Sequence, residues 1–326
     1  MKMHSRWIAV LAIAALNASP FAAAQDYPSK VITMIVPYSA GGPTDTVARL
    51  IAQAMGNDLK QTVIVENVAG AGGTIAAARV ARSAPDGYTM LIHHIGHATA
   101  PAMYKKLTYN VITDFEPVGL VTDVPMTLVA RKDFPAKDLK ELIVYVKANK
   151  DKVSMGSAGP GAVSHLCGLL FMSAIDTSLT TVQYKGSGPV MNDLLGGQID
   201  LTCDQTTNTT SHIRAGKIKA YGVTTMKRIP ALKELPTLNE AGLPNFEVTA
   251  WHGIYLPKGT PKPIIDRLAK ALQVALKDPA VIQRFADLGT EPATPEEATP
   301  QALRAKLKSE VDRWTPIIKK AGAYAE

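Results

Sequence analysis

Three short segments rich in glycine and small hydroxyl residues precede predicted helices. They are residues 39–45 (SAGGPTD), 156–161 (GSAGPG) and 185–189 (KGSGP). The start of a helix carries unpaired backbone N–H groups and the positive end of the helix dipole, and glycine lets a ligand approach the backbone closely. Each segment alone is typical of an ordinary turn. Three of them facing a common cleft favour a site for an anion.

Known nucleotide-binding patterns do not match these segments. A Walker A loop needs G-x-x-x-x-G-K-[ST] and a dinucleotide loop needs G-x-G-x-x-G, and residues 67–73 (NVAGAGG) come nearest to the second with the wrong spacing. The N-terminus of this chain predicts export from the cytoplasm, and nucleotides are not expected outside the cytoplasm. A carboxylate therefore fits the anion site better than a nucleotide.

Catalytic and metal-binding patterns are equally weak. Residues 185–189 lack the G-x-S-x-G frame, and the adjacent Ser164 and His165 do not face each other on a helix or strand. His93 and His97 form an i, i+4 pair, but H-E-x-x-H is missing, and we expect their segment to be a strand end that runs into a polar cleft loop. We therefore predict no enzyme activity, no metal and no cofactor.

The first 24 residues resemble a secretory signal peptide. A basic start precedes an apolar stretch at residues 7–16, and small residues follow at 22–24. We predict cleavage near Ala24 and export to a bacterial periplasm. The apolar stretch is short for the alternative, a retained membrane anchor.

The mature chain has a modest positive charge. Removing Lys2 and Arg6 with the signal peptide lowers the formal charge from +7 to +5, and no Lys/Arg block interleaved with aromatic residues indicates nucleic-acid binding. In an oxidising compartment Cys167 and Cys203 form either one disulfide or two buried free thiols, and the sequence leaves both open.

The elements that position the loops alternate between strand and helix from residue 31 to about 223. We predict strands at 31–36, 62–66, 88–93, 118–121, 126–131, 153–155, 179–184, 200–203 and 219–223, and helices at 44–55, 70–83, 139–149, after Ser164 and at 190–195. Thr44 and Asp138 are the expected N-caps. A β-prone stretch at 246–256 and helices at 261–277, 279–288 and 300–321 follow.

Two alternating series predict two α/β lobes with parallel sheets covered by helices. The terminal helices suggest that the chain returns to the first lobe, so that the stretches near 122–131 and 246–256 cross between lobes and let a cleft close. We predict a signal peptide at 1–24, a first lobe at 25–124 plus 252–326, and a second lobe at 125–251.

Residues 37–45 (PYSAGGPTD) resemble the signature of the Bug-type periplasmic receptors, the TctC-like substrate-binding subunits of tripartite tricarboxylate transporters. Further matches cover residues 27–322 and include 65–67 (VEN), 70–73 (GAGG), 84–89 (APDGYT), 184–186 (YKG), 193–197 (DLLGG), 235–238 (LPTL) and 240–242 (EAG). The resemblance implies an α/β, type II-like two-lobed periplasmic binding protein with two crossing strands, which closes on a carboxylate-bearing solute.

In this family, backbone N–H groups and bridging waters at two facing loops typically hold one carboxylate, and these loops match residues 38–45 and 157–165. The implied ligand-binding residues are Tyr38, Ser39, Ala40, Gly41, Gly42, Thr44, Asp45, His94, Thr99, Ser157, Gly159, Ser164, His165, Tyr184, Lys185, Gly186, Asp204 and Thr206. Many relatives carry Phe-Asp-Asn where this chain has Cys203, Asp204 and Gln205, at the distal end of the ligand. The substrate, a di- or tricarboxylate or an aromatic carboxylate, is therefore left open.

Two functions follow from the resemblance. The first is a monomeric receptor that delivers its ligand to the membrane subunits of a tripartite transporter. The alternative is a carboxylate sensor subunit that signals to a membrane histidine kinase. A periplasmic hydrolase is a third hypothesis, and it would require Ser164 or His165 to act in turnover.

Overall fold

The computed structural model describes residues 27–322, 324 and 325, and the predicted signal peptide lies outside these residues. The strands are β1 (Ile32–Val36), β2 (Val63–Asn67), β3 (Thr89–His93), β4 (Phe115–Arg131), β5 (Ser154–Ser157), β6 (Thr180–Gln183), β7 (Leu201–Gln205), β8 (Ile218–Val223) and β9 (Thr249–Pro257). The helices are α1 (Pro43–Leu59), α2 (Thr74–Ala81), α3 (Gly96–Met103), α4 (Leu139–Ala148), α5 (Val163–Ala174), α6 (Ser187–Leu195), α7 (Thr206–Arg214), α8 (Lys262–Ala275), α9 (Pro279–Asp287) and α10 (Pro300–Ala321), with short 3-10 turns η1 (Ala71–Gly73) and η2 (Pro230–Leu232).

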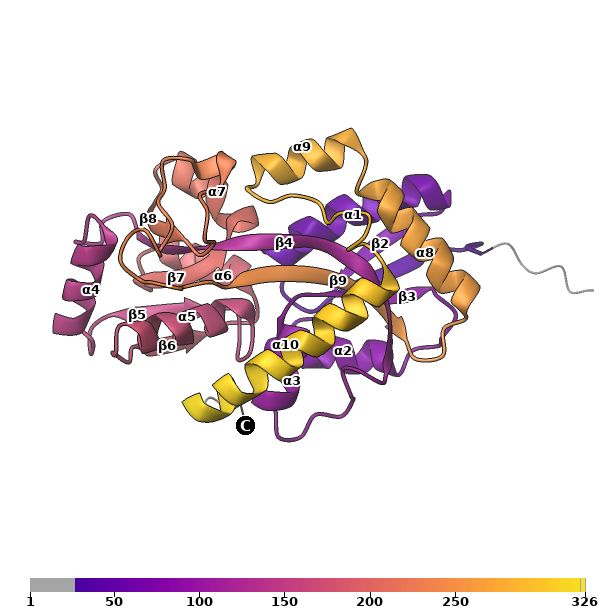
Figure 1. Cartoon of the computed structure of the whole chain (residues 1–326), viewed down its shortest axis with the longest axis horizontal. Coiled ribbons are helices and arrows are strands. Elements are labelled where there is room, and N and C mark those ends of the chain that lie inside the picture. Colours follow the sequence, from indigo (N-terminus) through magenta and orange to yellow (C-terminus); the bar gives the residue numbers. More distant parts are fainter. Residues whose placement is uncertain (1–26, 323, 326) are drawn as a thin grey trace, which may run out of the picture.

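The strands form one hydrogen-bonded sheet in the order β2-β1-β3-β9-β4-β7-β5-β6, and β8 also pairs with β4. β1 runs parallel to β2 and β3, and β5 runs parallel to β6 and β7, as the alternation of strands and helices predicts. β4 and β9 are antiparallel to each other and to their other neighbours. The sheet is therefore mixed, with a parallel group at each end and two long antiparallel strands between them (Figure 1).

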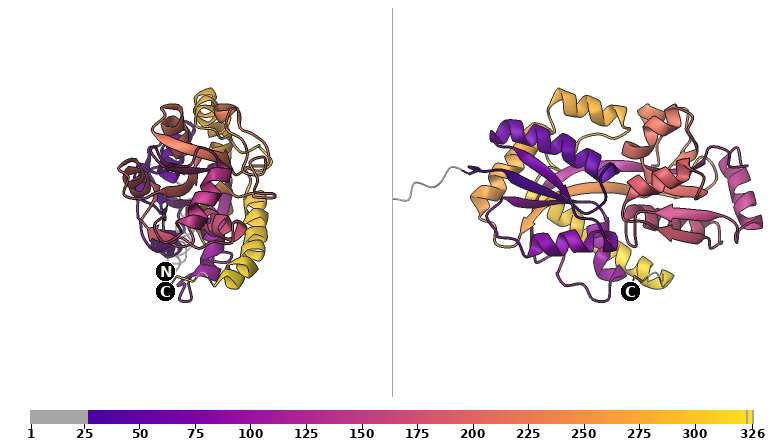
Figure 2. Two further views of the ribbon diagram at one scale, coloured as in Figure 1. Left: turned by 90° about the vertical axis from the view of Figure 1, so that its left-hand side faces the viewer. Right: turned by 180° about the vertical axis from the view of Figure 1, so that it is seen from behind.

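β4 joins the two groups of strands as one continuous strand. It pairs with β9 from Phe115 to Pro125 and with β7 and β8 from Met126 to Arg131. From the sequence we predicted two separate strands here, at 118–121 and 126–131. We call the group containing β1, β2 and β3 the first lobe and the group containing β5 to β8 the second lobe (Figure 2).

The two faces of the first lobe carry separate helices because side chains alternate along each strand. Met34 and Val36 of β1 lie in one core with α1 and α8, whereas Ile35 lies in a core shared with α2. No helix in the described part of the chain is long and apolar enough to cross a membrane.

One local expectation was wrong, one was right only in part and one was confirmed. Gly42, not Thr44, is the N-cap of α1, with Pro43 in the first turn, where its missing N–H costs no hydrogen bond. The loop expected after His93 is only two residues long, because β3 ends at His93 and α3 begins at Gly96. Asp138 caps α4 as predicted, since its side chain accepts the N–H of Glu141.

A disulfide links two elements of the second lobe. It joins Cys167 of α5 to Cys203 of β7, with the Cα atoms 6.0 Å apart. α5 follows the loop after β5, and β7 precedes the start of α7. The covalent link therefore restricts the movement of α5 relative to β7.

Candidate anion-binding site between the lobes

The predicted loops of the two lobes are in direct contact. The N–H of Ser39 donates to the carbonyl of Lys185 at 3.0 Å. A Cβ added to Gly42 would lie 3.6 Å from the nitrogen of Gly188, and one added to Gly188 would lie 3.1 Å from the carbonyl of Ala40. Residues 39–45 and 185–189 therefore pack against each other through their backbones.

The loop after β5 makes a second contact between the lobes. The hydroxyl of Tyr104 donates to the carbonyl of Pro160 at 2.9 Å, and that of Thr99 donates to the carbonyl of Gly161 at 3.1 Å. A Cβ at Gly72 would overlap the Pro160 carbonyl oxygen, so only glycine permits this approach. Both contacts hold the loops of the two lobes against each other.

Three of the described helices, α1, α5 and α6, begin next to these contacts. α1, α3, α5, α6 and α7 each follow the carboxyl end of a strand, namely β1, β3, β5, β6 and β7. α1 and α7 are in contact although they belong to different lobes. The N-terminal ends of several helices therefore face the space between the lobes, and this arrangement favours a bound anion.

Asp45 organises the first loop through three hydrogen bonds within the first lobe. It accepts hydrogen bonds from the N–H of Gly41 at 3.0 Å, from Arg49 at 3.0 Å and from Asn67 at 2.9 Å. Burial raises the pKa of Asp45, but these hydrogen bonds outweigh burial and lower the pKa below its usual value. Gly41 and Asp45 were both predicted to bind the ligand. In the structure the N–H of Gly41 and the carboxylate of Asp45 are hydrogen-bonded to each other.

Neutral aromatic side chains form the first-lobe side of the site. His94 stacks on Tyr38, with ring centroids 4.7 Å apart, and the Tyr38 hydroxyl donates to the carbonyl of Gly72 at 3.1 Å. The N–H of Gly96 donates to Nδ1 of His94 at 2.9 Å, so a neutral His94 carries its proton on Nε2. Burial lowers the pKa of His94 well below its usual value.

His252, which the sequence did not predict, joins this group from β9. Its Nε2 lies 3.2 Å from the hydroxyl of Thr44, and its ring centroid lies 5.7 Å from that of His94. Burial lowers the pKa of His252 to about 3, so the ring is neutral at ordinary pH. Nothing local in the sequence marks His252, because it reaches the site only through the pairing of β9 with β3 and β4.

Three predicted residues brace the loop after β5. The Ser164 hydroxyl accepts the N–H of Ala158 at 2.8 Å, and Nδ1 of His165 accepts the N–H of Gly161 at 3.2 Å. The Ser157 hydroxyl donates to Gln183 at 2.5 Å. Burial lowers the pKa of His165 to about 4, which keeps it a neutral acceptor. These side chains fix the conformation of the loop, including the backbone of Gly159.

Asp204 connects the starts of α6 and α7. It accepts hydrogen bonds from the Ser187 hydroxyl at 2.8 Å, the N–H of Gln205 at 2.9 Å and the Asn208 amide at 2.6 Å. Burial raises its pKa in spite of these hydrogen bonds. Asp204 is therefore a support within the second lobe.

The side chains of three further predicted residues, Thr206, Tyr184 and Lys185, are bonded to other groups or exposed. The Thr206 hydroxyl donates to the carbonyl of Gly289 at 3.1 Å, and the Tyr184 hydroxyl donates to Asp193 at 2.6 Å. The side chain of Lys185 is exposed. The Thr206 hydroxyl thus reaches the first lobe, whereas Lys185 contacts that lobe through its backbone carbonyl, which accepts the N–H of Ser39.

Several buried polar atoms at this contact have no partner among the described residues. They are Oγ of Ser39, Oε1 of Gln205, Oγ1 of Thr207 and Nδ1 of His252. A buried polar atom without a partner is costly, so these four atoms are candidates for contact with a ligand or water; Tyr109, Trp251 and Tyr255 carry such atoms in the core as well. Gln205, Thr207 and His252 were not predicted as site residues, although the hydroxyl-rich segment after Asp204 was a usable signal for the first two.

The histidines of the first lobe do not form a metal site. His93 and His97 have ring centroids 5.3 Å apart, and His97 packs against Phe115 in the core. Within residues 27–322, 324 and 325, no group of three or more His, Cys, Asp or Glu side chains is arranged to hold a metal ion.

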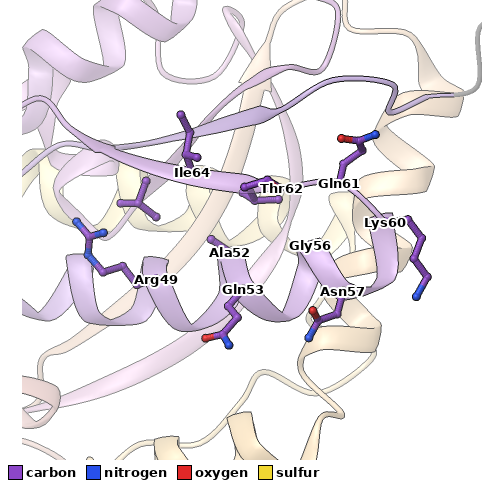
Figure 3. Close-up of a pocket in the computed structure, with 11 residues that line it drawn as sticks. Arg49, Ala52, Gln53, Gly56, Asn57, Lys60, Gln61, Thr62 and Ile64 are labelled. Carbon is purple, nitrogen blue, oxygen red and sulfur yellow. The ribbon is translucent and has the colours of Figure 1, made fainter.

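A surface cavity of about 810 Å³ lies between α1 and β2, away from the contact between the lobes (Figure 3). Arg49, Gln53 and Lys60 line it, and none of the predicted ligand-binding residues does. It flanks the middle and the C-terminal end of α1, where the helix dipole does not favour an anion.

Comparisons with known proteins identify the family. The model of the tripartite tricarboxylate transporter family receptor, TctC, matches residues 47–323. The UPF0065 protein in the TAR-I ttuE-ttuC' intergenic region of Agrobacterium vitis is 53% identical over 321 residues, which cover 98% of this chain and 93% of that protein.

Two solved structures are similar over almost the whole chain. The periplasmic binding protein BugD is 53% identical with a TM-score of 0.90, covering 92% of this chain and 100% of that one. MatC (Rpa3494) from Rhodopseudomonas palustris with bound malate is 43% identical with a TM-score of 0.87, covering 90% and 100%. The predicted periplasmic binding protein fold and the prediction of a non-catalytic protein are therefore confirmed by the family. The chain belongs to the TctC/Bug family of periplasmic solute-binding receptors of tripartite tricarboxylate transporters.

Proposed function

We propose that the protein binds a small dicarboxylate of the malate class between its lobes and delivers it to the membrane subunits of a tripartite tricarboxylate transporter. One observation carries this proposal: the loops that begin α1, α5 and α6 meet at the contact between the lobes, where Oγ of Ser39 is buried without a partner. The malate bound to MatC, at 43% identity, supports the choice of ligand class.

The charge of the ligand is balanced by backbone dipoles. Arg49 is paired with Asp45, and the Lys185 side chain is exposed, so neither cation is available inside the site. Helix N-termini supply donors that are already oriented, and a carboxylate that accepts them needs little reorganisation of the protein. Neutral His94 and His252, with Gln205 and Thr207, then contact the second polar group of the ligand.

The closed arrangement favours a small ligand. Ser39 and Lys185 are joined directly, and Tyr104 and Thr99 are joined to the loop after β5, so the two edges of the site are already in contact. We therefore rank four-carbon diacids ahead of tricarboxylates and aromatic acids, with the malate bound to MatC as support. Exclusion of water strengthens every hydrogen bond to the ligand.

We infer that residues 25–124 plus 252–326 and residues 125–251 move as two lobes. The pairing of β4 supports this division, because β4 changes partners between Pro125 and Met126. Closure about β4 and β9 would present a ligand-dependent surface to the membrane subunits. We also propose cleavage near Ala24 and a monomeric receptor in the periplasm.

Isothermal titration of the mature chain tests the ligand class. The series is malate, succinate, adipate, citrate and benzoate, and the control is malamide, the neutral diamide of malate, which has the same size without the charge. We expect malate or succinate to bind and malamide not to bind. Binding of malamide as tight as that of malate, or binding of amines or sugars alone, would reject a carboxylate receptor.

A further inference from the structure

One face of α7 caps the C-terminal end of α9. Three donors spaced four residues apart meet three consecutive carbonyls. The pairs are Thr206 Oγ1 with the Gly289 carbonyl at 3.1 Å, Thr210 Oγ1 with the Leu288 carbonyl at 3.1 Å, and Arg214 Nη1 with the Asp287 carbonyl at 3.3 Å. Residues at i, i+4 and i+8 share one face of a helix, and the last carbonyls of a helix lack partners within it. We call these three hydrogen bonds the α7–α9 clasp.

The clasp connects the two lobes. Val281 and Phe285 of α9 lie in the first-lobe core with α1 and α8. α7 belongs to the second lobe, where the Thr209 hydroxyl lies 2.8 Å from that of Thr127 on β4. The helices meet closely: at Gly289, with φ +79°, an added Cβ would lie 3.2 Å from Cβ of Thr206.

The chain after α9 is attached to β4 next to the point where β4 changes partners. The Thr290 hydroxyl donates to the carbonyl of Asp123 at 3.1 Å, and the N–H of Ala293 donates to the carbonyl of Val121 at 2.9 Å. The end of α9 is therefore fixed to the crossing strand, and α7 is held against a rigid part of the first lobe.

The other end of the clasped helix reaches the proposed ligand site. α7 begins at Thr206, and its neighbours Gln205 and Thr207 carry two of the buried polar atoms without partners. α7 is also in contact with α1 of the first lobe. An α7 that tilted away from α9 would carry Gln205 and Thr207 out of the site.

We propose that the α7–α9 clasp holds the lobes closed and positions the start of α7 on the ligand, so that Thr210 is a positioning residue for binding although it does not touch the ligand. This inference rests on the proposed function, because it assumes that the ligand lies between the lobes. The ligand gains affinity from the clasp because closure costs less when α7 is already held in place.

Thr210→Val tests the clasp, with Thr209→Val as its matched control. Both threonines are buried on α7, and the same nearly isosteric change removes one hydroxyl from each. Thr210 bonds across the lobes, whereas Thr209 bonds to Thr127 and to the carbonyl of Gln205, both within the second lobe. The net value of one hydrogen bond predicts that T210V weakens malate binding about 3- to 10-fold, mainly through faster dissociation.

Three readouts separate the possible outcomes. We expect T210V to dissociate malate faster and to have a larger radius of gyration without ligand by small-angle scattering, while T209V only lowers the melting temperature. Arg214→Met, an exposed change, should show a weaker form of the T210V effect if T210V folds poorly. Equal affinity, dissociation rate and radius in T210V and T209V would overturn the clasp. If the wild-type chain binds no carboxylate, the proposed function fails, and the scattering comparison still decides the clasp.

Discussion

Gly72 limits how closely the lobes approach, so adding one methyl group there should hinder closure. Gly72→Ala would place Cβ 2.6 Å from the Tyr104 hydroxyl and 3.2 Å from the carbonyl carbon of Pro160, and it would overlap the carbonyl oxygen of Pro160. Tyr104 can rotate, but Pro160 is backbone of the opposite lobe. In the Gly72→Ala variant the lobes must therefore stay further apart at this point, and this hinders their closure around a ligand.

The expected size follows from the contacts that this separation breaks. Tyr104–Pro160 and Thr99–Gly161 are the two hydrogen bonds between the lobes next to Gly72. At a net value of about 1 kcal/mol each, their loss costs about 2 kcal/mol of closure, or an affinity about 30-fold weaker. The positive φ of +59° adds strain of about 1 kcal/mol for alanine, and this strain affects folding rather than binding.

Gly216→Ala is the matched control for backbone strain. Gly216 has φ +60°, and a Cβ there would meet no atom within 4 Å. Titration calorimetry with malate gives the affinities, and thermal unfolding without ligand gives the stabilities. We expect similar losses of stability in both variants and a loss of affinity in G72A alone. If G72A bound malate as tightly as G216A does, the closed contact at Pro160 would not be part of the ligand-bound form.

Three further predictions concern the site, its titration and its export. His252→Phe should weaken malate binding about tenfold by calorimetry with little change in fold, because it removes one buried hydrogen-bonding group; unchanged affinity would exclude His252 from the site. Burial lowers the pKa of His94 and of His252, the latter to about 3, so both remain neutral on folding, whereas the unfolded chain takes up protons below its histidine pKa of about 6.5. Unfolding free energy should therefore decline as pH falls below about 6.5, while malate affinity stays constant from about pH 6 to 8. An affinity that increases steeply as pH falls from about 8 to 6 would mean that a histidine is protonated in the complex. Mass spectrometry of the exported protein should give Gln25 as the first residue, and retention of residues 1–24 would contradict the predicted signal peptide.

Local chemistry made much of the architecture predictable. Glycine, proline and small hydroxyl residues mark the segments 39–45, 156–161 and 185–189 whatever the rest of the chain does, and the structure brings all three to the contact between the lobes. Asp138 was predictable for the same reason, since an N-cap bonds within its own turn.

Features that depend on distant partners were not predictable. α3 contains Gly96 and Pro101, which disfavour a helix locally, and it forms because Ala98 and Met103 pack into the core. Thr44 has the composition of an N-cap, yet its hydroxyl is paired with His252, 208 residues away. The role of His252 follows from strand pairing, which no local pattern reveals.

Several polar side chains that we expected to bind the ligand are bonded to other groups of the protein. From the sequence we predicted Asp45, Asp204 and Thr206 as ligand-binding residues. In the structure their side chains are bonded to Gly41, Ser187 and Gly289. A carboxylate receptor that uses helix dipoles needs such side chains to hold the loops in place, and this distinction is visible only once the hydrogen bonds are known.

The most direct test of the binding site is a crystal structure of the mature chain with bromosuccinate, whose bromine can be located by anomalous scattering. The proposed site predicts one bromine position between the lobes, with a carboxylate at the starts of α1 and α6 and the bromine near His252 or Thr207. A bromine in the cavity between α1 and β2, or on the outer surface alone, would contradict a carboxylate site formed by the convergent helix N-termini.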